Sequence, residues 1–120
     1  MNRRPGNQWL GRCCVAGAIC FAGMPVMAQD GARLALGEKV FVSSCGSCHD
    51  TGRTQNDAPQ LSDGAEWKDR AGKGRAELYK SAIEGFDAYY VMPPRGGNAA
   101  LADDEVKAAV DYLLRRAGVK

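Results

Sequence analysis

The chain has 120 residues, a length that suits one small domain. Its 16 basic and 14 acidic residues give a formal net charge of +2 at pH 7. Arg3, Arg4 and Arg12 are the basic residues before position 29, where no acidic residue occurs, so the charge without that segment is −1. A charge so close to neutral excludes the strongly basic surface that is typical of nucleic-acid binding.

The first 28 residues have the three zones of a secretory signal. A basic start is followed by an apolar run from Cys13 to Met24, which is shorter than a typical membrane span. Val26-Met27-Ala28 suits the positions before a cleavage site, so we expect cleavage after Ala28 and one domain of residues 29–120. We expect this domain in the periplasm of a Gram-negative bacterium. The alternative is an uncleaved leader that anchors it to the inner membrane.

The stretch Cys45-Gly46-Ser47-Cys48-His49 fits C-x-x-C-H, the attachment signature of a c-type haem. Two thiols three positions apart on a helical turn can each add to one of two neighbouring vinyl groups, which gives two thioethers. The histidine after the second thiol is then placed to supply an axial nitrogen. The motif therefore predicts a covalent haem c held by Cys45 and Cys48, with His49 as an iron ligand.

Other uses of a C-x-x-C pair have less support. A thioredoxin-like dithiol requires a βαβ context, and no strand-rich apolar run flanks the motif. A zinc site requires further ligands, but the chain has no second histidine and, after residue 28, no third cysteine.

A helix over residues 33–49 is predicted to lead into the motif, because residues recur on one face at positions 37, 40, 41, 44, 45 and 48. A glycine inside a helix costs up to ~1 kcal/mol relative to alanine. We interpret Gly37 as the place where another helix crosses closely, and Phe41 as a core residue. The alternative for Gly37 is a frayed helix start.

Turn-forming residues fill positions 50–66, where we expect a loop, and 66–70 is expected to be a short polar segment. The pattern then predicts an amphipathic helix from Arg75 to Phe86, ended by Gly85. No segment alternates with a period of two over strand length. The predicted fold class is therefore all-α.

The last helix is predicted from Asp103 to Ala117, with Gly118 at its C-terminal cap. Ala102 stands where a hydroxyl cap is common. We therefore expect Asp103 to cap this helix, with a frayed first turn.

Met92 is the single methionine after residue 28. It precedes Pro93-Pro94 in a stiff polar loop, where a methionine that only fills a core gap would be poorly placed. A thioether opposite an imidazole favours ferrous iron and raises the reduction potential. We therefore predict Met92 as the second iron ligand.

Three further residues are predicted to contact the haem. The carbonyl of Pro59 can accept the Nδ1 proton of His49 and fix its tautomer. The indole N–H of Trp67 can bond a propionate, and Arg70 can balance the propionate charge. The structural alternatives are a plain loop proline, a surface-packing aromatic and a solvated charge.

These segments resemble the class I bacterial cytochromes c, and the cytochrome c5 group most closely. The resemblance covers nearly all of residues 29–120, and the M-P-P loop makes it more specific than C-x-x-C-H alone. Besides the haem motif, the segments that carry it are Gly37-Glu38-Lys39-Val40-Phe41, Ala58-Pro59, Trp67-Lys68-Asp69-Arg70, Met92-Pro93-Pro94, Gly96-Gly97 and Ala109-Val110-Asp111-Tyr112.

The resemblance implies a small all-α fold of three to four helices around one haem, with the first and last helices crossing near Gly37 and Phe41. It assigns haem attachment to Cys45 and Cys48 and axial ligation to His49 and Met92. It implies a one-electron carrier of a respiratory chain, not an enzyme.

Its expected partners are a donor reductase and an acceptor oxidase or reductase, bound weakly, with possible peripheral association with membrane complexes and no nucleic acid. Two alternatives stay open: a haem subunit of a larger periplasmic or membrane-associated oxidoreductase, and a haem sensor or catalyst with an open iron site.

One departure from the family concerns the loop after the methionine. Some cytochromes of the c5 type have a disulfide there, whereas this chain has Asn98-Ala99-Ala100-Leu101. We expect the loop to depend on Pro93, Pro94 and the packing of Leu101. Arg95 is expected to bias the orientation of redox partners.

Overall fold

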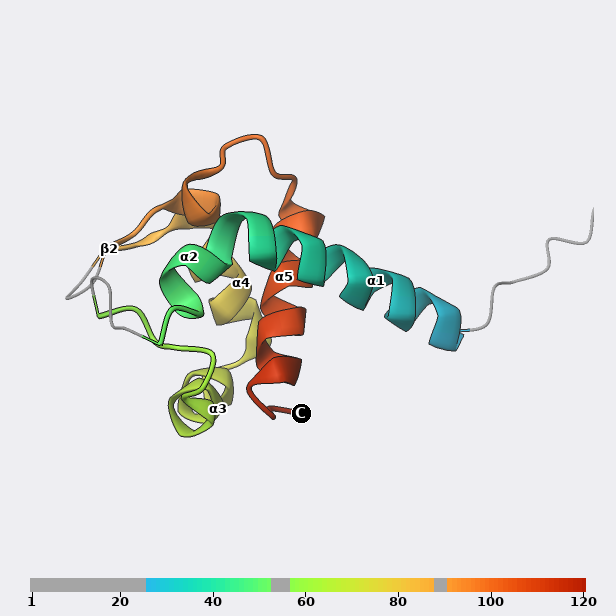
Figure 1. Cartoon of the computed structure of the whole chain (residues 1–120), viewed down its shortest axis with the longest axis horizontal. Coiled ribbons are helices and arrows are strands. Elements are labelled where there is room, and N and C mark those ends of the chain that lie inside the picture. Colours follow the sequence, from blue (N-terminus) through green and yellow to red (C-terminus); the bar gives the residue numbers. More distant parts are fainter. Residues whose placement is uncertain (1–25, 53–56, 88–90) are drawn as a thin grey trace, which may run out of the picture.

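The computed structural model describes residues 26–52, 57–87 and 91–120 (Figure 1). The leader predicted over residues 1–28 lies almost entirely outside the described residues. The elements, in chain order, are helix α1 (Val26–Val40), a π-helical turn η1 (Phe41–Cys45), α2 (Gly46–His49), α3 (Gly64–Gly72), α4 (Arg75–Glu84), strands β1 (Phe86–Asp87) and β2 (Val91–Met92), a 3-10 segment η3 (Pro94–Gly97) and α5 (Asp103–Arg116).

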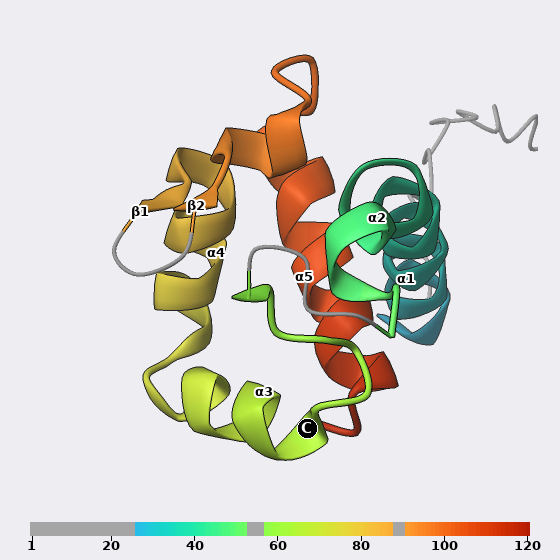
Figure 2. The same ribbon diagram turned by 60° about the vertical axis from the view of Figure 1, so that its left-hand side comes forward.

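Helix α5 lies in the middle of the arrangement, and α1 and α4 both pack on it. Figure 2 shows α1 and α2 on one side of α5, α4 and the strand pair on the other, and α3 across the end where the C-terminus lies. Within the described part of the chain, no helix is long and apolar enough to cross a membrane.

The first helix differs from its prediction at both ends. It begins at Val26, seven residues before the predicted start at residue 33, and it does not continue regularly into the haem motif. After Val40 the chain continues as the wider π-helical turn η1, where the N–H of Gly46 donates to the carbonyl of Phe41, five residues earlier. Such π-helical turns occur often at functional sites, and this one directly precedes the motif.

Gly37 lies where α1 crosses α5, as the sequence predicts. A Cβ built on Gly37 would be 2.1 Å from the carbonyl oxygen of Ala108 and 3.0 Å from Cβ of Tyr112. Phe41 is 2 % exposed and belongs to the core cluster, as expected. The absence of a side chain at position 37 therefore allows the two helices to meet at backbone distance.

The segment after the haem motif is more ordered than predicted. The expected polar stretch 66–70 is part of α3, which starts at Gly64 inside the predicted loop. Glu66 and Arg70 form an i,i+4 ion pair on its outer face, and Trp67 is buried on its inner face. This helix is one side of a packed core, and a short polar window does not reveal that.

The last two helices match their predictions closely. Gly85 follows α4 with φ of 87°, and Gly118 follows α5 with φ of 76°. The N–H of Gly118 donates to Arg115 and that of Val119 to Leu114, which is the Schellman pattern. Positive φ favours glycine at both ends.

Two details of the C-terminal half differ from prediction. The predicted all-α fold also contains one short antiparallel pair, with Phe86 opposite Met92 and Asp87 opposite Val91. Strands of two residues are too short to show an alternating pattern. Asp103 does not cap α5; instead, the side chain of Glu105 accepts the backbone N–H of Ala102 at 2.8 Å.

Candidate functional site

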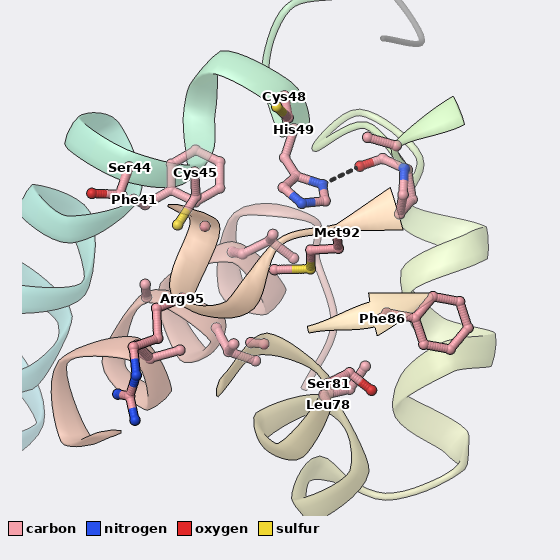
Figure 3. A pocket seen from close by; sticks show the side chains of 18 of the residues that line it. Phe41, Ser44, Cys45, Cys48, His49, Leu78, Ser81, Phe86, Met92 and Arg95 are labelled. Atoms are coloured by element: carbon pink, nitrogen blue, oxygen red, sulfur yellow. Dashed lines mark hydrogen bonds between the residues drawn. The ribbon is translucent and has the colours of Figure 1, made fainter. Parts of the chain in front are cut away.

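A cavity of about 250 Å³ lies between the helices (Figure 3). All the residues predicted to bind haem line it: Cys45, Cys48, His49, Pro59, Trp67, Arg70 and Met92. Much of the remaining wall is apolar, with Val40, Leu78, Ala82, Val106, Ala109 and Leu113 among its residues. The cavity therefore combines sulfur and nitrogen donors with the apolar walls that a porphyrin requires.

His49, the last residue of α2, is buried at 8 % exposure. Its Nδ1 lies 2.8 Å from the carbonyl oxygen of Pro59, the contact predicted from the sequence. A carbonyl only accepts, so this contact requires the proton on Nδ1 and leaves Nε2 with its lone pair. Figure 3 shows the second ring nitrogen directed into the cavity, on the side of Met92. The imidazole is thus held in the tautomer that binds a metal through Nε2.

Gln60 is a buried polar residue that sequence reasoning missed. It is 6 % exposed, and its Nε2 donates to the carbonyls of Cys48 at 2.9 Å and Ala58 at 2.8 Å. Its Oε1 accepts the backbone N–H of Thr51 at 3.1 Å. In the sequence it is one more polar residue in a loop, and only its place beside Pro59 could have drawn attention to it.

The predicted role of Trp67 needs correction. Its indole Nε1 donates to the backbone carbonyl of Gln60 at 2.8 Å, so this N–H is not directed to a haem propionate. The ring lies against the imidazole of His49, with centroids 5.7 Å apart and an angle of 60° between the planes. Trp67 therefore supports the loop that carries Pro59, and this bond gives its buried indole N–H the partner that such a group usually has.

Arg70 lines the cavity, but its guanidinium bonds Glu66 one turn earlier in α3. Its pairing with a propionate stays a prediction.

The two motif cysteines are half-buried and are not joined by a disulfide. Burial raises the pKa of the Cys45 thiol above its ordinary value, and the nearby Cys48 adds to the shift. A thiol that stays protonated is a poor redox nucleophile and a poor metal ligand. In the described part of the chain, no three His, Cys, Asp or Glu residues gather as a metal site would require. The raised pKa of Cys45 weighs against a redox-active dithiol at this pair.

Met92 reaches the cavity from β2, opposite the element that carries His49 (Figure 3). Its loop is tightly folded: Arg95, Gly96 and Gly97 all have left-handed backbones, with φ of 56°, 64° and 84°. A Cβ on Gly96 would lie 2.7 Å from the carbonyl oxygen of Ser44. The loop that carries the thioether therefore packs directly on the turn that carries Cys45.

Arg95 holds this loop to α5. One guanidinium nitrogen donates to the carbonyl of Leu101 at 2.7 Å, and the other to Oδ1 of Asp103 at 2.6 Å. Figure 3 shows the guanidinium directed away from Met92. Arg95 therefore has an internal role, and the loop does not depend only on its prolines and Leu101. Its expected role in orienting redox partners stays a prediction.

Comparison with known proteins connects this site to a family. The family model described as "Cytochrome C oxidase, cbb3-type, subunit III" matches residues 32–113, a range that contains both halves of the site. The chain belongs to the class I cytochromes c. It therefore binds haem c covalently, with its iron, and the predicted fold class and cofactor are confirmed.

Three relatives illustrate the match. Cytochrome c-555 of Chlorobaculum tepidum is 37 % identical over 81 residues, which is 67 % of this chain and 73 % of that protein. Cytochrome c5 of Azotobacter vinelandii is 41 % identical over 79 residues, 64 % of this chain and 89 % of that protein. A solved chain from "Crystal structure of electron transfer complex of nitrite reductase with cytochrome c" has a TM-score of 0.59 at 35 % identity, covering 68 % of this chain and 94 % of that one.

The described residues of this cytochrome suit a covalently bound haem. Two unbridged thiols, an imidazole fixed at Nδ1 and a thioether line one apolar-walled cavity. The protein is accordingly a c-type haem electron carrier that works with redox partner proteins.

Proposed function

We propose that residues 29–120 form a periplasmic carrier that moves one electron at a time, with His49 and Met92 as the axial ligands. The observation that carries this proposal is that an imidazole from α2 and a thioether from β2 line the same cavity from separate elements. When bound, the haem supplies the Fe(II)/Fe(III) couple. Two protein ligands leave no open coordination position for a substrate, which favours a carrier over an enzyme.

Cys45 and Cys48 are proposed to hold the haem through thioethers formed by addition of each S–H across a vinyl group. Electrons would enter and leave near these cysteines and the Met92 loop. The similar solved chain comes from an electron transfer complex of nitrite reductase with cytochrome c, which supports a reductase among the acceptors. Docking is expected to be weak and transient, over a small interface. Because the net charge without the leader is −1, strong electrostatic steering of the partner is not expected.

The periplasmic location is supported by the composition of residues 1–28. Cleavage after Ala28 would fall in the first turn of α1, where residues 28–32 are exposed. Arg33, which bonds Asp111, and the Gly37 crossing would both remain. The intact mass of the haem-loaded protein, recovered from the periplasm, tests both the location and the cleavage site.

The visible spectrum of the haem-loaded protein tests the ligation. The ferric form is expected to show the weak red band of iron–sulfur ligation, and Met92→Ala is expected to remove it. Val91→Ala is the matched control, because Val91 is the neighbouring residue and is 68 % exposed. A wild-type spectrum without the band, together with ready carbon monoxide binding in the ferrous form, would contradict the proposal and favour the open-site sensor or catalyst.

A second candidate function is a haem subunit of a larger oxidoreductase. It is favoured by the description of the matching family, which names an oxidase subunit. The size of the native protein after gentle extraction decides between the two. A monomer supports the free carrier, whereas co-purification with a larger oxidoreductase supports the subunit.

A further inference from the structure

Gln60 reaches both backbone segments that meet at the proximal ligand. Its Nε2 donates to the carbonyl of Cys48, which belongs to the peptide entering His49, and to the carbonyl of Ala58, which belongs to the peptide entering Pro59. The two distances are 2.9 Å and 2.8 Å. One amide nitrogen therefore spans the two segments whose own contact is the bond from His49 Nδ1 to the Pro59 carbonyl.

The surroundings of Gln60 fix its orientation. Two carbonyl oxygens face one end of the side-chain amide and require a donor there. The backbone N–H and the hydroxyl of Thr51, at 3.1 Å and 3.4 Å, face the other end, where the backbone N–H requires an acceptor. The backbone carbonyl of Gln60 is held in turn by the indole of Trp67. A buried polar network with every partner satisfied is rigid, so this amide has one favourable position.

We propose that Gln60 is a positioning residue that sets the strength of the hydrogen bond between His49 and Pro59, and through it the reduction potential of the haem. The inference rests on the proposed function, in which His49 is an axial ligand. Donation from Nδ1 to a carbonyl raises the basicity of the ligating imidazole. A more basic ligand stabilises ferric iron and lowers the potential. Without the amide bridge, the Pro59 segment is free to recede, the bond weakens and the potential rises.

The substitution Gln60→Met tests this, because methionine has a similar length and keeps none of the side-chain hydrogen bonds. We expect a higher potential than that of the wild type. In the ferrous protein, the His49 Nδ1 proton is expected to exchange with solvent at least tenfold faster by NMR. General loosening would have the opposite effect on the potential, since water near the haem stabilises the charged ferric form. An unchanged or lowered potential would overturn the proposal.

Tyr79→Phe is the control for loss of stability alone. It removes the 2.6 Å bond from the tyrosine hydroxyl to Asp111, and Tyr79 does not line the haem cavity. This variant is expected to leave the potential and the His49 exchange rate unchanged. Equal shifts in Tyr79→Phe and Gln60→Met would show that destabilisation explains both, and would refute the role of Gln60.

Exchange in the wild type provides a test if Gln60→Met does not accumulate. The His49 Nδ1 proton and the side-chain amide protons of Gln60 are expected to exchange through one opening, at rates within tenfold of each other. A much faster His49 proton would overturn the proposal. The red iron–sulfur band separates this inference from the proposed function. If Gln60→Met keeps the band, the ligation by His49 and Met92 is intact and only the role of Gln60 is being tested. If the wild type lacks the band, the proposed ligation itself is refuted.

Discussion

Substitution of Gly37 by alanine is expected to destabilise the protein through the crossing of α1 and α5. The new Cβ would lie 2.1 Å from the carbonyl oxygen of Ala108, 2.7 Å from its carbonyl carbon and 3.0 Å from Cβ of Tyr112. Two of these neighbours are backbone atoms inside a helix, which cannot rotate away as a side chain can. The helices must therefore separate.

Overpacking of a well-packed core costs about 1–3 kcal/mol, and backbone contacts this short place Gly37→Ala at the upper end, about 3 kcal/mol. Alanine recovers about 1 kcal/mol of helix propensity relative to glycine. The net expectation is a loss of about 2 kcal/mol in the free energy of unfolding.

The assay is denaturant unfolding of the haem-loaded ferric protein, with Gly31→Ala as the matched control. Gly31 lies in the same helix and has no atom within 4 Å of a built Cβ. Gly31→Ala is therefore expected to stabilise the protein by up to about 1 kcal/mol. Equal effects of the two substitutions would refute the reasoning, because the crossing would then impose no steric demand.

Two further predictions concern the distal loop and the outer polar cluster. Arg95→Gln loses the bonds to Leu101 and Asp103, and is expected to lower the free energy of unfolding by about 1–2 kcal/mol and to lower the temperature at which the iron–sulfur band disappears. For Tyr79, burial and then the bond to Asp111 raise the pKa above its ordinary value of 10.0. The folded state thus holds this proton more tightly than the unfolded state, so the associated stability is present below pH 10 and is lost as the pH rises further. The free energy of unfolding, measured from pH 8 to 11, should therefore decline less steeply in Tyr79→Phe than in the wild type.

Much of the fold could be predicted because it is encoded locally. Residues 75–84 and 103–116 have regular apolar spacing and are followed within two residues by glycines with positive φ, so a short window contains the whole signal. Gly37 was predicted correctly for another reason. A glycine inside a helix is unfavourable for the helix itself, so its presence indicates close contact with another element.

The parts that could not be predicted depend on contacts between distant segments. Nothing near Arg95 in the sequence indicates that its guanidinium folds back onto Leu101 and Asp103. Gln60 and Trp67 pose the same difficulty, because a buried amide and an exposed amide look alike in a sequence. The donor atoms of the site follow from the motif, whereas the residues that hold those donors in place follow only from the fold.

The haem cavity and the core of this protein share most of their residues. Among the described residues, most of the buried apolar side chains also line the cavity: Val40, Phe41, Trp67, Ala82, Val106, Ala109 and Leu113. Ala108 and Leu114 are buried without lining it. A chain of this size has little apolar surface to spare for a second core, so burial of these side chains depends on what fills the cavity. Folding and haem attachment are therefore expected to be coupled, and the protein without haem is expected to be poorly folded.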